Sequence, residues 1–153
     1  MSASNAPEFA NPDPAAIAAL LRRVRTIAVV GLSPRADRPS HQVAAGLQAA
    51  GYRIIPVRPA VDEVLGERAW PCLEDIPAEE RRAIDLVDVF RAPQYVDALV
   101  DSCLALKLPA LWLQDGVVNP AAARRAQQAG MVVVMDRCTW RDYRQLVAGE
   151  PPR

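Results

Sequence analysis

Hydroxyl and guanidinium side chains gather in one short segment, residues 31–40, directly after an apolar run. The run Ile27–Val30 is rich in β-branched residues and too short for a helix, which predicts a strand buried on both faces. Gly31 ends the run, and Pro39 can occupy the first turn of a helix that continues to Gly51. Unpaired N–H groups at such a helix start favour an anion, so we expect a phosphate-binding turn. The side chains that would add donors and charge are Ser33, Arg35, Arg38 and Ser40.

This segment lacks the second and third glycines of the G-x-G-x-x-G dinucleotide fingerprint, so a plain strand-to-helix turn is the alternative. Arg58, at the end of the next apolar run, is the second candidate for binding chemistry. NAD sites usually have an acidic residue at the corresponding place to hold the ribose diol. A cation there suits a phosphorylated ribose, either the 2′-phosphate of NADP or the 3′-phosphate of coenzyme A. The alternative is a solvated charge, or an ion pair with Asp62 or Glu63.

Cys138 follows a predicted strand, beside Arg137 and at the start of the last predicted helix, and these features lower a thiol pKa. Three interpretations stay open: a packed thiol, a mixed disulfide with the thiol of coenzyme A, or a nucleophile.

His41 lies in a first helical turn without an orienting partner nearby in sequence, and this position favours a surface or phosphate-adjacent role over that of a base. Asp85 and Asp88 are three apart on a strand, on opposite faces, which argues against a carboxylate dyad.

These residues must be positioned by strands and helices that alternate along the whole chain. Strands are expected at Ile27–Val30, Tyr52–Val57, Ile84–Phe90, Ala110–Gln114 and Met131–Met135. Helices are expected from Asp13, Pro39, Pro93 and Asn119, and a final one carries Trp140, Tyr143 and Val147. A β-α-β unit of this length predicts a right-handed parallel crossover. The fold class is therefore α/β, with an open, doubly wound, mainly parallel sheet of about five or six strands and helices on both faces.

The remaining segments set the expected domain boundaries. Residues 1–12 are small, polar and broken by proline, so we expect a loose tail, and residues 149–153 form a proline-rich stub. Residues 13–148 are expected to form a single domain. Within it, residues 60–77 contain several breakers and predict a loop with a short edge strand near Arg68–Cys72.

In such sheets, ligands bind beyond the carboxyl ends of the strands, so the residues at those ends are candidates. Phe90 and Trp112 could instead be core residues or walls of a cleft, because aromatic side chains bury large areas in any small domain. The candidate cofactor-binding residues are Gly31, Leu32, Ser33, Arg38, Pro39, Ser40, Arg58, Pro59, Phe90, Arg91, Trp112 and Gln114.

Composition excludes several other classes of protein. Lys plus Arg and Asp plus Glu number 18 each in 153 residues, without the basic excess expected of a nucleic-acid binder. Three cysteines with no C-x-x-C spacing, and one histidine, argue for a reducing compartment and against a metal site. No run approaches the length of a membrane span and no secretion signal is evident, so we expect a cytoplasmic protein without a nucleic-acid or membrane partner.

Six ordered motifs carry a resemblance to a known family. GLSPRADRPS, PVRP, EVLGERAWPCLEDIP, LVDVFRAP, ALWLQDGVVN and VVMDRC, together spanning roughly residues 25–138, resemble the CoA-binding domain family of small single-domain bacterial proteins. That family is related to the nucleotide-binding domain of the succinyl-CoA synthetase alpha subunit. The resemblance implies a Rossmann-like fold and a site for coenzyme A.

Carried over by motif, the resemblance implies contacts from the 31–40 segment to the diphosphate, and from Arg58 and Pro59 near the adenosine. Phe90 and Arg91 follow the third main strand. Two residues depart from the family pattern: Arg58 replaces an asparagine, and Asp115 adds a negative charge near an anionic ligand, which predicts weaker binding than in relatives.

The leading hypothesis is a binding protein that holds coenzyme A or an acyl-CoA at the carboxyl edge of the sheet, with no chemistry of its own. The alternative is an enzyme, either an NADP-dependent oxidoreductase or an accessory subunit of an acyl-CoA ligase. The sequence does not specify the acyl group or the oligomeric state, a homodimer included.

Overall fold

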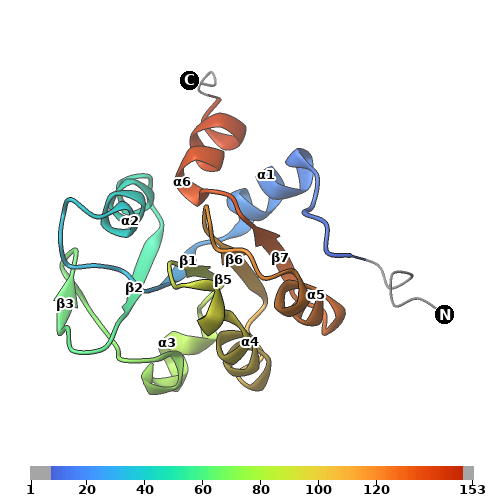
Figure 1. Cartoon of the computed structure of the whole chain (residues 1–153). Coiled ribbons are helices and arrows are strands. Elements are labelled where there is room, and N and C mark those ends of the chain that lie inside the picture. The colour runs from blue at the N-terminus through green and yellow to red at the C-terminus, as the bar shows by residue number, and fades with distance from the viewer. Residues whose placement is uncertain (1–7, 150–153) are drawn as a thin grey trace.

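The centre of the molecule is a five-stranded, all-parallel sheet (Figure 1). The structure, a computed structural model, describes residues 8–149. The strands are β1 (Thr26–Val30), β2 (Arg53–Val57), β5 (Leu86–Val89), β6 (Ala110–Leu113) and β7 (Val132–Met135), in the order β2-β1-β5-β6-β7. The chain therefore reverses its direction of winding between β1 and β5, as in doubly wound folds. The predicted α/β class and the five principal strands are confirmed.

Helices cover both faces of the sheet (Figure 1). One face carries α1 (Pro14–Arg23), α2 (Pro39–Ala49) and α6 (Thr139–Asp142), the last continuing as a π-helical turn, Tyr143–Val147. The other carries α3 (Ala78–Arg82), α4 (Val96–Ala105) and α5 (Pro120–Gln128), with short 3-10 turns at Leu73–Asp75 and Pro93–Tyr95.

Alternation along each strand divides the core into two apolar layers. Ala28 and Val30 face the α4–α5 layer, whereas Ile27 and Val29 face the α1–α2 layer, and all four side chains are buried. This pattern explains why the strands read as continuous apolar runs. Three helices start at their predicted prolines, Pro14, Pro39 and Pro120, and Asp13 and Asn119 cap two of them by accepting an N–H three residues ahead. The helix predicted from Pro93 begins as a 3-10 turn, and α4 itself starts at Val96.

The segment from residue 60 to 77 differs from the predicted edge strand. Its two short strands, β3 (Glu63–Val64) and β4 (Glu67–Arg68), pair with each other in an antiparallel hairpin apart from the main sheet. Only Trp70 joins the edge of β2, donating to the carbonyl of Pro56 and accepting from the N–H of Arg58. Proline at position 56 leaves the edge with one N–H fewer, which limits further pairing.

The expected tail, residues 1–12, lies partly within the described residues. Asn11 bonds the backbone of Met135 twice, donating to its carbonyl at 2.9 Å and accepting from its N–H at 2.7 Å, and Phe9 packs on the core. Residues 9–11 therefore cover the end of β7 in place of a loose segment, while residues 1–7 and 150–153 lie outside the described residues. Among residues 8–149, no helix is long and apolar enough to cross a membrane.

Candidate functional site

Gly31 opens a crevice at the switch point between β1 and β5. It adopts φ +87°, and its N–H donates to the carbonyl of Val57 at 2.8 Å. A Cβ at this position would lie 2.3 Å from the carbonyl oxygen of Phe90. Only glycine fits this close approach. Because position 31 is a glycine, the chain can turn away from the end of β1, which lies between β2 and β5.

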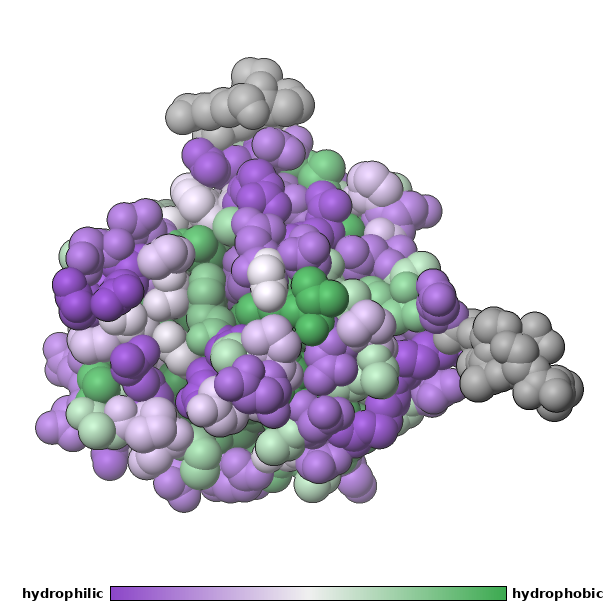
Figure 2. Space-filling view, in the orientation of Figure 1, coloured by the Kyte–Doolittle hydropathy of each residue, from purple (hydrophilic) through white to green (hydrophobic). Residues whose placement is uncertain are grey.

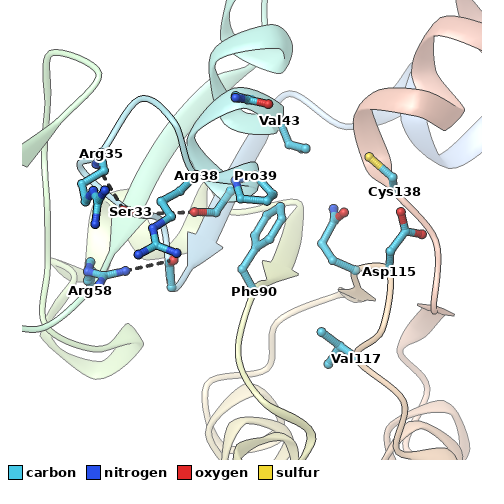
Figure 3. Close-up of a pocket in the computed structure, with 14 residues that line it drawn as sticks. Ser33, Arg35, Arg38, Pro39, Val43, Arg58, Phe90, Asp115, Val117 and Cys138 are labelled. Atoms are coloured by element: carbon cyan, nitrogen blue, oxygen red, sulfur yellow. Dashed lines mark hydrogen bonds between the residues drawn. The ribbon is translucent and has the colours of Figure 1, made fainter.

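A pocket of about 740 Å³ lies beyond these strand ends, within the size range of small-molecule sites. Figure 3 shows the arginines on one side of it and Asp115, Val117 and Cys138 on the other, with Phe90 and Pro39 between them. In the same view as Figure 1, apolar residues are visible in a hollow beside α2, surrounded by hydrophilic ones (Figure 2). The residues that line the pocket are Gly31, Ser33, Arg35, Arg38, Pro39, Ser40, Gln42, Val43, Arg58, Phe90, Gln114, Asp115, Val117 and Cys138.

The start of α2 faces this pocket through a folded turn. Ser40 accepts the N–H of Ser33 at 3.0 Å, and the Ser33 hydroxyl accepts the N–H of Arg35 at 3.1 Å. His41 contacts the carbonyl of Ser33 through Nδ1 at 3.0 Å, so the one histidine supports the turn and does not line the pocket. Because the N-cap, Arg38, makes no side-chain cap, the first N–H groups of the helix stay available to an anion.

Two guanidinium groups bring positive charge to this side of the pocket. Within residues 8–149, neither Arg38 nor Arg58 has a carboxylate at ion-pair distance, so the possible partners of Arg58, Asp62 and Glu63, do not pair with it. Arg58 Nη1 instead donates to the carbonyl of Gly31 at 3.3 Å, which holds it beside the turn. Arg35, the third arginine on this side, is paired with Asp37, so the unpaired guanidinium groups of Arg38 and Arg58 supply the net positive charge that favours an anionic ligand.

Four of the predicted site residues lie away from the pocket. Leu32 and Trp112 are fully buried in the core, and the indole N–H of Trp112 donates to the carbonyl of Arg137. Pro59 and Arg91 line a smaller apolar cavity of about 200 Å³ on the α4 side, where the Arg91 guanidinium stacks over the ring of Tyr95. The other eight predicted residues line the main pocket together.

A buried polar triad lies beneath the pocket and includes Gln114. Gln114 Nε2 donates to Asp88 Oδ1 at 2.7 Å and to Thr139 Oγ1 at 2.8 Å, and the Thr139 hydroxyl donates to Asp88 Oδ2 at 3.0 Å. All three side chains are at least 97% buried. Burial raises the pKa of Asp88 to about 7, although both hydrogen bonds favour its ionised form. Sequence reasoning missed this triad because it joins residues up to 51 positions apart.

The far wall of the pocket carries a charge pair and a thiol. Arg141 holds Asp115 through two bonds of 2.8 and 2.9 Å, which lowers the pKa of Asp115 and neutralises the charge expected to oppose an anionic ligand. Burial raises the pKa of the Cys138 thiol, and this outweighs the nearby N–H groups of Trp140 and Arg141 that lower it. Desolvation therefore outweighs the features of its position that lower a thiol pKa, which favours the packed thiol over the nucleophile.

Three lining residues were not singled out from the sequence, namely Gln42, Val43 and Val117. Val43 belongs to the second turn of α2, where an apolar side chain at helical spacing indicates packing and gives no signal of a ligand. Within residues 8–149, no three His, Cys, Asp or Glu side chains lie close enough together to hold a metal ion.

Comparison with known proteins gives one family and several close relatives. The sequence pattern of the family described as "CoA binding domain" matches residues 25–144. An uncharacterised protein of Bacillus subtilis, YneT, is 42% identical over 128 residues, which is 84% of this chain and 92% of that protein.

Two solved structures have the same fold over nearly their whole length. A hypothetical protein from Pyrococcus horikoshii OT3 is 30% identical, with a TM-score of 0.82, over 92% of this chain and 99% of that one. A protein from Thermus thermophilus is 34% identical, with a TM-score of 0.81, over 88% of this chain and 99% of that one.

Proposed function

The chain belongs to the CoA-binding domain family, and from this premise we propose that its pocket binds coenzyme A or an acyl-CoA without chemistry of its own. The observation that carries the proposal is the pairing of two guanidinium groups with the start of α2 in one pocket. Neither Arg38 nor Arg58 has an acidic partner within residues 8–149. The phosphates of coenzyme A are the anions that these groups would bind.

The opposite side of the pocket suits the uncharged arm of the ligand. Val117 supplies apolar surface there, Val43 and Phe90 continue that surface toward the arginines, and the charge of Asp115 is held by Arg141. The raised pKa of Cys138 keeps its thiol protonated near neutral pH, which supports a binding role over a nucleophilic one. We assign this function to the domain expected over residues 13–148.

Arg38→Ala is expected to weaken binding of coenzyme A by about tenfold to a hundredfold, because it removes a charged hydrogen bond to phosphate. Isothermal titration of wild type and variant at low and high salt measures this, and binding to wild type should weaken as salt rises. The matched control is Arg68→Ala, which removes an equal charge from a side chain that stacks on Trp70 outside the pocket. Unchanged affinity in a folded Arg38→Ala protein, or equal losses in both variants, would remove Arg38 from the site.

Arg58→Ala tests which phosphate of the ligand the Arg58 guanidinium contacts. If Arg58 contacts the 3′-phosphate, dephospho-CoA binds wild type less tightly than coenzyme A, and the variant loses that difference. The coupling in this cycle is expected to be about 1 kcal/mol or more, against roughly zero for a solvated arginine. Tighter binding of NADP than of coenzyme A, with NAD far weaker, would instead favour the oxidoreductase alternative.

A further inference from the structure

The buried triad fixes the orientation of the Gln114 amide. Both hydrogens of Nε2 are used, one by Asp88 Oδ1 and one by Thr139 Oγ1. The Thr139 hydroxyl can accept from Gln114 only while it donates its own hydrogen to Asp88 Oδ2. While Asp88 is ionised, each member therefore determines the polarity of the next, and a flipped amide would place its carbonyl oxygen against the carboxylate of Asp88.

This orientation leaves one acceptor of Gln114 unused. Among residues 8–149, no group donates to its Oε1, although the side chain is 97% buried and lines the pocket. Oε1 is not one of the buried polar atoms that lack a partner, so it is accessible from the pocket, where a ligand N–H or a water can donate to it. Since Nε2 is held within the triad, Oε1 is the polar atom that Gln114 can offer to the pocket.

The position of Gln114 in the pocket indicates which part of the ligand it would contact. Its chain neighbour Asp115 lies on the Cys138 side of the pocket, away from Arg38 and Arg58 (Figure 3). With the phosphates at the arginines, the arm of coenzyme A runs toward this side. That arm carries two secondary amides, and each of them has an N–H donor.

We propose that Gln114 Oε1 accepts an amide N–H of the ligand arm, and that Asp88 and Thr139 are positioning residues that hold the acceptor in place. The proposal rests on the function proposed above and adds the group that distinguishes a ligand with the arm from the nucleotide alone. A preorganised acceptor of this kind costs little reorganisation on binding.

The test is made at pH 8, where Asp88 is ionised, and compares coenzyme A with 3′-phosphoadenosine 5′-diphosphate, which has the same phosphates but no arm. In Gln114→Met, of similar volume, the affinity for coenzyme A should fall by about three- to tenfold while the affinity for the nucleotide stays the same. Equal changes for both ligands, or no change for either, would overturn the proposal. If wild type binds neither ligand, the proposed function fails and the role of Gln114 with it.

Thr139 supplies a second test that leaves Gln114 in place. Thr139→Val removes the hydroxyl that holds the amide, and it should reduce the preference for coenzyme A over the nucleotide. Thr139→Ser keeps the hydroxyl and should restore that preference, which a purely structural loss would not predict. This pair decides the question even if Gln114→Met fails to fold, and equal preferences in the two Thr139 variants would contradict the assignment.

Discussion

Gly31→Ala is expected to lower the free energy of unfolding by about 2–6 kcal/mol, a large fraction of the stability of a domain of this size. Two separate costs add at this position. The backbone has φ +87°, where an alanine is strained, and the added Cβ would lie 2.3 Å from the carbonyl oxygen of Phe90. Because that neighbour is backbone at the end of β5, it can retreat only by disturbing the parallel pairing of β1 and β5.

Gly130→Ala is the matched control for Gly31→Ala. Gly130 also has a positive φ, +100°, but nothing lies within 4 Å of an added Cβ, so only the backbone strain applies. Urea denaturation of wild type and both variants measures the difference. Equal losses in the two alanine variants would show that the close approach to Phe90 costs nothing, and that Gly31 is needed for its backbone angle alone.

Local signals were enough to predict the sheet and most helices of this chain. Buried parallel strands are short apolar runs, and proline with an upstream capping side chain marks a helix start, as at Asp13 and Asn119. The hairpin at β3 and β4 escaped prediction because its strands are two residues long and its turn places Leu65, a residue unusual at positive φ, beside Gly66.

The sequence predicts the site residues that directly follow a strand. It does not predict which cavity a residue lines when that depends on the direction of its side chain. Gly31 and Arg58 are in the pocket because each directly follows a strand. Phe90 and Arg91 are neighbours in sequence, yet they line different cavities. Their separation follows from where the side chains point as the chain leaves β5, which the sequence alone does not specify.

Gln114 and Asp88 show the same limit more sharply. Gln114 could be placed at the end of β6, but its partners lie on β5 and at the start of α6, and only the pairing of strands brings them together. In the sequence, Asp88 is an acidic residue within an otherwise apolar strand. In the fold it is the acceptor that orients the amide of Gln114.

Asp88→Asn is expected to change how stability depends on pH. The pKa of Asp88 is about 7 in the folded protein, against 3.8 for an unperturbed aspartate, so between these values the folded state holds a proton that the unfolded state has lost. Stability from this group therefore falls as pH rises from about 4 to about 7, and the loss is complete above pH 7. At about 1.4 kcal/mol per pKa unit, the loss is on the order of 4 kcal/mol.

The asparagine variant has no proton to lose at this position. As pH rises, wild type should therefore lose stability relative to the variant, and the difference in their unfolding free energies should change by up to about 4 kcal/mol. Urea denaturation of both proteins at half-unit steps from pH 4.5 to pH 8 measures that difference, and taking it removes the contributions of the other carboxylates. Asp85→Asn is the control, since it removes a carboxylate at the opposite end of β5 that accepts the N–H groups of Arg25 and Thr26. Because desolvation is the main cause of the raised pKa, the pH-dependent difference requires that Asp88 stay sealed beneath the pocket. Curves for wild type and Asp88→Asn that run parallel across this range would show that water reaches the carboxylate, and that the Gln114 amide is held by a solvated group.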